Sequence, residues 1–121
     1  MPRIRLRHVV ARRQYQLVSS HENDAKFLSI AFSKPVRVRG SADYVCFYEI
    51  SGGSKAGLRR AVGVDSIQAL VLAFTNAATM LYTSEEYKAG RLTHRTDENL
   101  GLPTFASLSD LVRGEKTSAF L

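Results

Sequence analysis

Cysteine is almost absent from this sequence, and motifs for metal binding are missing. Cys46 is the only cysteine, so no disulfide can form within the chain, which is typical of a reducing compartment. The three histidines are far apart, and neither a His-Glu-x-x-His nor a Cys-x-x-Cys motif occurs. The sequence therefore predicts no metal site and no cofactor.

Long hydrophobic runs are also missing. The most apolar stretch, residues 67–81, is interrupted by four polar side chains and is shorter than the roughly 20 residues that a membrane helix needs. Residues 1–8 alternate charged and apolar side chains, and no apolar core of a signal peptide follows them. These absences predict a cytoplasmic protein with no membrane partner.

The sequence does have the composition of one globular domain. It contains 121 residues, of which 45% are apolar and 23% charged, so one core can form without disulfides or metals. We expect a single domain over residues 1–121, with residues 114–121 as a loose tail. The net charge of +6 is uneven: residues 1–60 carry 12 basic and 4 acidic side chains (+8), and residues 61–121 carry 5 and 7 (−2). The first half is therefore the more attractive one for an anionic partner.

Alternating apolar and polar residues predict strands in the first half of the chain. These patterns cover residues 3–10, 26–32, 36–39, 43–51 and 58–64, and a short extended segment is expected at 91–96. Arg12 and Arg13 interrupt the first pattern, and its continuation at residues 15–18 past a bulge stays open. Residues 43–51 give the strongest signal, because apolar and aromatic side chains occupy both faces, as in a central strand. The glycine-rich residues 52–57 predict a hairpin loop, since a phosphate-binding loop would be followed directly by a helix.

One long helix is expected over about residues 65–88. Asp65 is a good N-cap, Gln68 completes a capping box, and Gly90 is suited to end the helix. Three- and four-residue spacing predicts one buried apolar face, made of Ile67, Leu70, Val71, Phe74, Ala77, Ala78, Leu81 and Tyr82. These patterns together predict an α+β fold, in which an antiparallel sheet of four to five strands in roughly sequential order packs on this central helix.

Few side chains are arranged for catalysis. Cys46 lies between apolar neighbours in a predicted strand, so we expect a core residue rather than a nucleophile. His94 lies close to Arg95 and Asp97, a polar setting that would allow acid–base chemistry. A small enzyme based on His94 therefore stays open, with an exposed strand residue as the alternative interpretation.

Arginine is the most distinctive residue type, because it supplies 12 of the 17 basic side chains. We expect one sheet face, opposite the helix, to bind a partner through Arg3, Arg5, Arg7, Arg37, Arg39, Arg59 and Arg60. The planar guanidinium suits both carboxylates and phosphates, so an acidic protein or a nucleic acid fits such a surface. RNA-binding sheets usually add exposed stacking aromatics, whereas most aromatics here fall on faces predicted to be core. This favours a protein partner.

Three segments resemble a family of small bacterial proteins catalogued as a domain of unknown function. They are Asp-Tyr-Val-Cys-Phe-Tyr-Glu-Ile at residues 43–50, residues 60–70, and Leu-Gly-Leu-Pro at residues 100–103. The most specific is the pattern Gly-Val-Asp-x-x-Gln-Ala-Leu within the second segment, and the resemblance spans roughly residues 5–103. Because this pattern is a strand-to-helix turn with a capping box, the resemblance implies a shared fold and lends no catalytic residues. Proteins of this size and character are similar to the immunity partners of bacterial toxins.

The leading hypothesis is a non-enzymatic protein-binding module, namely an immunity protein that neutralises an acidic toxin by forming a complex with it. Nucleic-acid binding through the same arginines is the alternative, and it predicts affinity that falls steeply with salt. Exposed edge strands at residues 3–10 or 36–39 would also allow a homo-oligomer.

Overall fold

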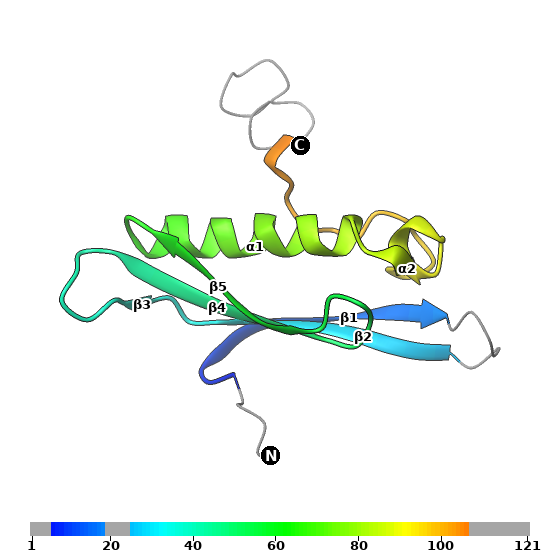
Figure 1. Cartoon of the computed structure of the whole chain (residues 1–121), viewed down its shortest axis with the longest axis horizontal. Coiled ribbons are helices and arrows are strands. Elements are labelled where there is room, and N and C mark those ends of the chain that lie inside the picture. Colours follow the sequence, from blue (N-terminus) through cyan, green and yellow to red (C-terminus); the bar gives the residue numbers. More distant parts are fainter. Residues whose placement is uncertain (1–5, 19–24, 107–121) are drawn as a thin grey trace.

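The computed structural model describes residues 6–18 and 25–106, which form an antiparallel sheet with two helices on one side of it (Figure 1). The strands are β1 (Val9–Val18), β2 (Ala25–Ser33), β3 (Val36–Arg37), β4 (Tyr44–Ser51), β5 (Gly57–Gly63) and β6 (Leu92–Thr93), and the helices are α1 (Ser66–Tyr82) and α2 (Glu85–Lys88). The predicted α+β class and antiparallel sheet are confirmed. The strand count was wrong, because the sheet has six strands rather than four to five.

The strand order follows the chain for most of the sheet. β1 pairs with β2, β2 with β4, and β4 with β5, while β6 returns to the free side of β1. β3 pairs with the first residues of β4, and β2 pairs with the later residues of β4 along the same edge of that strand. Where the chain passes from β2 to β3, the Ser33 hydroxyl accepts a hydrogen bond of 3.0 Å from the Phe47 N–H. This side chain thereby satisfies a backbone donor that neither strand reaches.

The first strand begins later than the alternation at residues 3–10 predicts. β1 starts at Val9 and continues through Arg12 and Arg13, with a bulge between Val9 and Ala11. His8 has a φ of 54°, in the left-handed region, so the chain turns just before β1. Residues 3–5 lie outside the described residues. The alternating charges of residues 6–8 therefore belong to a segment that precedes the sheet, not to a strand.

The predicted helix over residues 65–88 is wrong in its length. α1 ends at Tyr82, because Ser84 adopts an extended backbone and its hydroxyl caps α2 by accepting from the Tyr87 N–H at 3.2 Å. Gly90, with a φ of 73°, follows the end of α2 rather than the end of one long helix. Neither helix in the described part of the chain is long and apolar enough to span a membrane.

The start of α1 agrees with the sequence. The Asp65 carboxylate accepts from the Gln68 N–H at 2.8 Å, which confirms the predicted N-cap. The Gln68 side chain reaches back and accepts from the Val64 N–H, also at 2.8 Å. This reciprocal pair fixes the turn from β5 into α1, although the second bond falls one residue earlier than in the usual capping box.

The buried face of α1 is made of small residues. Ala69, Ala73 and Ala77 are fully buried in the core, whereas Ile67, predicted to be part of the buried stripe, is 73% exposed. Alanines allow the helix axis to approach the sheet closely, and a Cβ atom added at Gly63 would lie 2.4 Å from the Ala69 nitrogen. The first turn of α1 therefore packs directly on the β5 backbone, and Ile67 is left pointing away from the core.

Candidate binding surface

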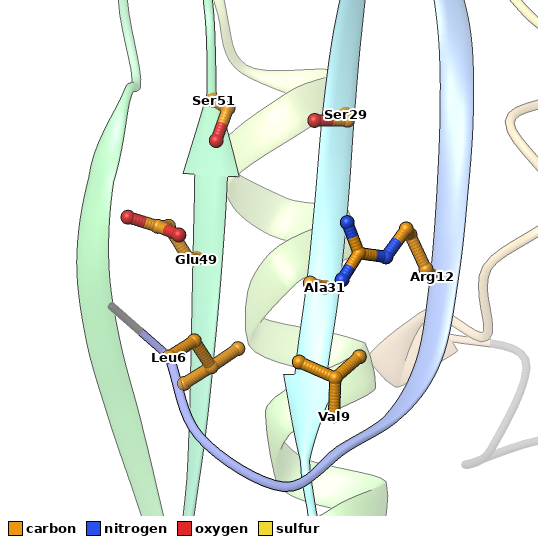
Figure 2. A pocket seen from close by; sticks show the side chains of 7 residues that line it. All are labelled: Leu6, Val9, Arg12, Ser29, Ala31, Glu49 and Ser51. Carbon is orange, nitrogen blue, oxygen red and sulfur yellow. The ribbon is translucent and has the colours of Figure 1, made fainter.

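The sheet face that points away from α1, called the outer face here, is crossed by the residues that precede β1. Leu6 lies close to side chains of both β2 and β4, and Figure 2 shows it on the face of the sheet opposite α1. Cross-strand pairing aligns Arg12, Ala31, Glu49 and Leu58 on this face, one from each of four strands. The crossing segment leaves a hollow on each of its two sides.

The first hollow is polar and measures about 490 Å³. Figure 2 shows Arg12 reaching from β1 over β2, with Ser29 on β2 and Ser51 on β4 beyond it. The Glu49 carboxylate points toward β5, away from Arg12 (Figure 2). The Arg12 guanidinium is thus aimed into the hollow, where it can donate hydrogen bonds to a carboxylate of a partner.

The second hollow, of about 420 Å³, is mainly apolar. It lies at the end of the sheet where β3, β4 and β5 meet, and we name its surroundings the outer patch: Leu6, Val36, Phe47, Leu58 and Val62. Val36 and Val62 both pair with Val45, so three valines form a row across the three strands. Arg7, Lys34 and Arg60 are exposed at its rim. The outer patch is therefore apolar at its centre and basic at its edge.

The predicted arginines do not gather on one face. Arg60 pairs with Phe47 and lies on the outer face, whereas Arg59 pairs with Tyr48 and lies on the helix side. Arg37 pairs with Tyr44, which also puts it on the helix side, and its Nε donates to the Ser41 carbonyl at 3.0 Å. Neighbouring residues of a strand point to opposite faces, so residues 59 and 60 cannot share one surface.

The remaining predicted arginines are spread along the chain. Arg7 lines the apolar hollow, and Arg39 is exposed in the loop after β3. Arg3 and Arg5 lie outside the described residues. Only Arg7 and Arg60 of the predicted set are therefore placed at the outer patch, while Arg12, which the sequence-based set omitted, lines the polar hollow.

Two further arginines have structural roles. Arg13 Nη1 donates to the carbonyls of Leu100 and Gly101, at 3.0 and 2.8 Å, and holds the loop after β6 against β1. Arg91 Nη1 donates to the Val18 carbonyl at 3.0 Å, which ties the end of β1 to the start of β6. Part of the arginine content therefore serves the fold and not a binding surface.

The surroundings of His94 give no support to an acid–base pair. The His94 ring packs edge-on against Tyr15, with ring centroids 5.5 Å apart, and its backbone forms two hydrogen bonds of 2.9 Å with Asp97. The Asp97 carboxylate accepts from the Asn99 N–H and so stabilises its own turn. Burial raises the pKa of Tyr15, whose hydroxyl donates to the Leu100 carbonyl at 2.8 Å. These contacts are those of a packed loop.

Cys46 has the environment of a core residue. It is fully buried, its Sγ donates to the Ser33 carbonyl at 3.3 Å, and burial raises the pKa of its thiol. A raised pKa opposes the thiolate form that a nucleophile needs. Among the described residues, no group of three or more histidine, cysteine, aspartate or glutamate side chains could hold a metal ion.

Comparison with known proteins gives one result. No curated protein and no solved structure matches the chain. A family model matches residues 11–104, which include all six strands except the first two residues of β1, and both helices. The chain therefore belongs to the family described as Domain of unknown function (DUF6968).

Proposed function

We propose that this domain is a non-enzymatic protein-binding module and that it binds through the outer patch. The observation that supports the proposal most is the exposure of Val36, Leu58 and Val62, which are 42%, 40% and 48% exposed on one sheet face. A contiguous apolar surface with a polar rim is typical of a protein interaction site. The apolar hollow beside Leu6 offers space for an anchoring side chain of the partner.

The charges around the outer patch favour an acidic partner. Arg7, Lys34 and Arg60 lie at its rim, and Arg12 lies in the neighbouring polar hollow. Partner carboxylates at these positions would speed association and select against basic proteins. A toxin that the domain neutralises is one partner of this chemistry. The immunity hypothesis stays a prediction, and its test compares the growth of cells that express the partner with and without this chain.

The spacing of aromatic residues does not favour the nucleic-acid alternative. Within residues 6–18 and 25–106, the aromatics of the outer face are Phe27 on β2 and Phe47 on β4. In the register of the sheet, Phe47 on β4 lies beside Ser33 on β2. Ser33 is six residues from Phe27 along β2, so the two aromatic rings are separated by about 20 Å in the strand direction. Neighbouring bases could not stack on both rings, so a platform of the kind that RNA-binding sheets use is not formed.

The test compares two valines of the outer face that are equally exposed. Val62 lies in the outer patch and Val18 at the far end of β1, and each is 48% exposed. We expect Val62→Glu to weaken a purified partner's binding at least about tenfold, and Val18→Glu to leave it unchanged. Equal effects of the two substitutions on affinity, with both variants folded, would refute the outer patch as the binding site.

The salt dependence of the binding affinity distinguishes a protein partner from a nucleic acid. If the wild-type protein binds DNA or RNA at about 50 mM salt, and this affinity falls steeply as the salt concentration rises, nucleic-acid binding replaces the protein-binding proposal. A protein complex anchored by apolar contacts is expected to lose less affinity over the same range, because salt screens only its rim charges.

A further inference from the structure

β5 forms a lateral edge of the sheet, next to the outer patch. It pairs with β4 along its whole length, from Tyr44 opposite Gly63 to Ile50 opposite Gly57, without a bulge. No other strand of the described part of the sheet pairs with β5. One row of its backbone N–H and C=O groups is therefore directed away from the sheet.

The residues that carry these outward groups follow from a single hydrogen bond. The Phe47 N–H donates to the Ser33 hydroxyl, so it points toward β2 and not toward β5. In an antiparallel ladder, Phe47 and Arg60 are then a pair without mutual hydrogen bonds, and the Arg60 N–H and C=O point outward. Because this direction alternates along a strand, the backbone groups of Leu58 and Val62 also point outward.

This edge lacks several of the features with which proteins block further pairing, and its charged side chains, Arg59 and Arg60, are both positive. Residues 57–63 contain neither proline nor lysine, and their register with β4 is continuous. The next outward donor along the chain, the Val64 N–H, is already bound by the Gln68 side chain, so the open edge ends there. Three residues with six outward backbone groups therefore have no strand partner in the described part of the chain, and they lie next to the exposed side chains of Val64 and Ile67.

We propose that β5 accepts an extended, acidic segment of the partner as an additional antiparallel or parallel strand of the sheet. The inference rests on the proposed function, since it gives the way in which a partner at the outer patch is held. Main-chain hydrogen bonds to Leu58, Arg60 and Val62 supply affinity, and alternate side chains of the segment supply specificity. On the outer face, apolar side chains lie beside Leu58 and Val62, and a carboxylate lies beside Arg60.

The positive charge of β5 favours an acidic partner segment over a second copy of this chain as the strand that pairs with it. Pairing of β5 with β5 of another copy would bring four arginines, Arg59 and Arg60 from each, onto one seam. Like charges across a strand pair are destabilising, whereas acidic residues on either face of an added strand meet Arg60 on one side and Arg59 on the other. The segment therefore alternates apolar and acidic residues on its outer side and carries a further acid on the helix side.

A randomised peptide library displayed on phage, selected against the intact chain, tests the inference without knowledge of the partner. We expect enriched peptides in which an acidic residue has apolar residues two positions before and two positions after it, with a second acid directly next to the first. Bound peptide should slow amide hydrogen exchange at Leu58, Arg60 and Val62, and leave Arg59 and Ala61, which face β4, unchanged. Because this measurement uses the wild-type chain, it does not depend on whether any variant folds.

A pair of substitutions at one position isolates the backbone contribution. Leu58→Pro and Leu58→Ala both remove the leucine side chain, but only proline removes the outward N–H. We expect the proline variant to bind an enriched peptide about tenfold more weakly than the alanine variant, the factor of about one hydrogen bond. Unchanged exchange at the three outward amides, equal affinities of the two variants, or no enriched acidic peptide would overturn the inference. If Val62→Glu still weakens the protein partner in that case, the outer patch stands and only strand addition falls.

Discussion

Replacing Gly63 by alanine tests how closely α1 approaches the sheet. The added Cβ would lie 2.4 Å from the Ala69 nitrogen, 2.8 Å from the Gln68 carbonyl carbon and 2.9 Å from the Ala69 Cα. All three are backbone atoms, so no side chain can rotate out of the way. To restore a contact near 3.5 Å, the first turn of α1 must move by about 1 Å, which disturbs the packing of the alanine face.

The expected cost lies at the upper end of the range for overpacked sites, about 3 kcal/mol. For a domain of this size it corresponds to a fall in Tm of about 12 °C, which urea denaturation and thermal unfolding followed by circular dichroism can measure. Gly40→Ala is the matched control, because Gly40 has a φ of 77° and open space within 4 Å of an added Cβ. Its cost is about 1 kcal/mol from backbone conformation alone. A loss for Gly63→Ala no larger than that for Gly40→Ala would refute the close approach.

Three further predictions concern stability and its dependence on pH. Asp65→Ala should lower the free energy of unfolding by about 1 kcal/mol, measured by urea denaturation, because the first turn of α1 loses its cap. Burial acts to raise the pKa of Glu86, but hydrogen bonds, among them one of 2.9 Å from the Ser54 N–H, lower it below its ordinary value of 4.5. The ionised group therefore contributes stability above pH 4.5 that is lost as the pH falls through the depressed pKa, so wild type should lose more stability on acidification than Glu86→Gln; parallel curves would contradict this. Ile67→Lys should change stability by no more than about 0.5 kcal/mol, because the side chain is 73% exposed, and a larger loss would show that Ile67 supports the core.

The strands that sequence patterns predicted best are those whose signal is local. Residues 26–32, 43–51 and 58–64 closely match β2, β4 and β5, since period-two alternation and a glycine-rich hairpin loop act within each segment. The first strand was expected to be interrupted at Arg12 and Arg13, whereas β1 continues through both residues and Arg13 faces its core side. The charge of Arg13 is satisfied by carbonyls at Leu100 and Gly101, 87 and 88 residues away, which no local pattern reveals.

The break between α1 and α2 could have been predicted. Ser84 is followed by two glutamates, which is the composition of a helix start, whereas Gly90 as a stop signal favours one helix that continues to residue 88. The separation of Arg59 and Arg60 also follows from alternation alone. The outer patch could not be predicted in the same way, because Phe47 and Val62 become candidates only when the face that α1 covers is known.

The turn from β5 into α1 has two sets of residues with different roles. Gly63, Asp65 and Gln68 make the turn: the glycine lets the helix approach, and the two polar side chains close its first turn. Val64 and Ile67, interspersed among them, are 69% and 73% exposed and contribute little to the core. A rigid turn that holds two large apolar side chains in solvent loses little further conformational freedom when a partner covers them. The same rigidity fixes the outward groups of β5 beside them, so the element that sets the fold also presents the surface through which we propose that the domain binds.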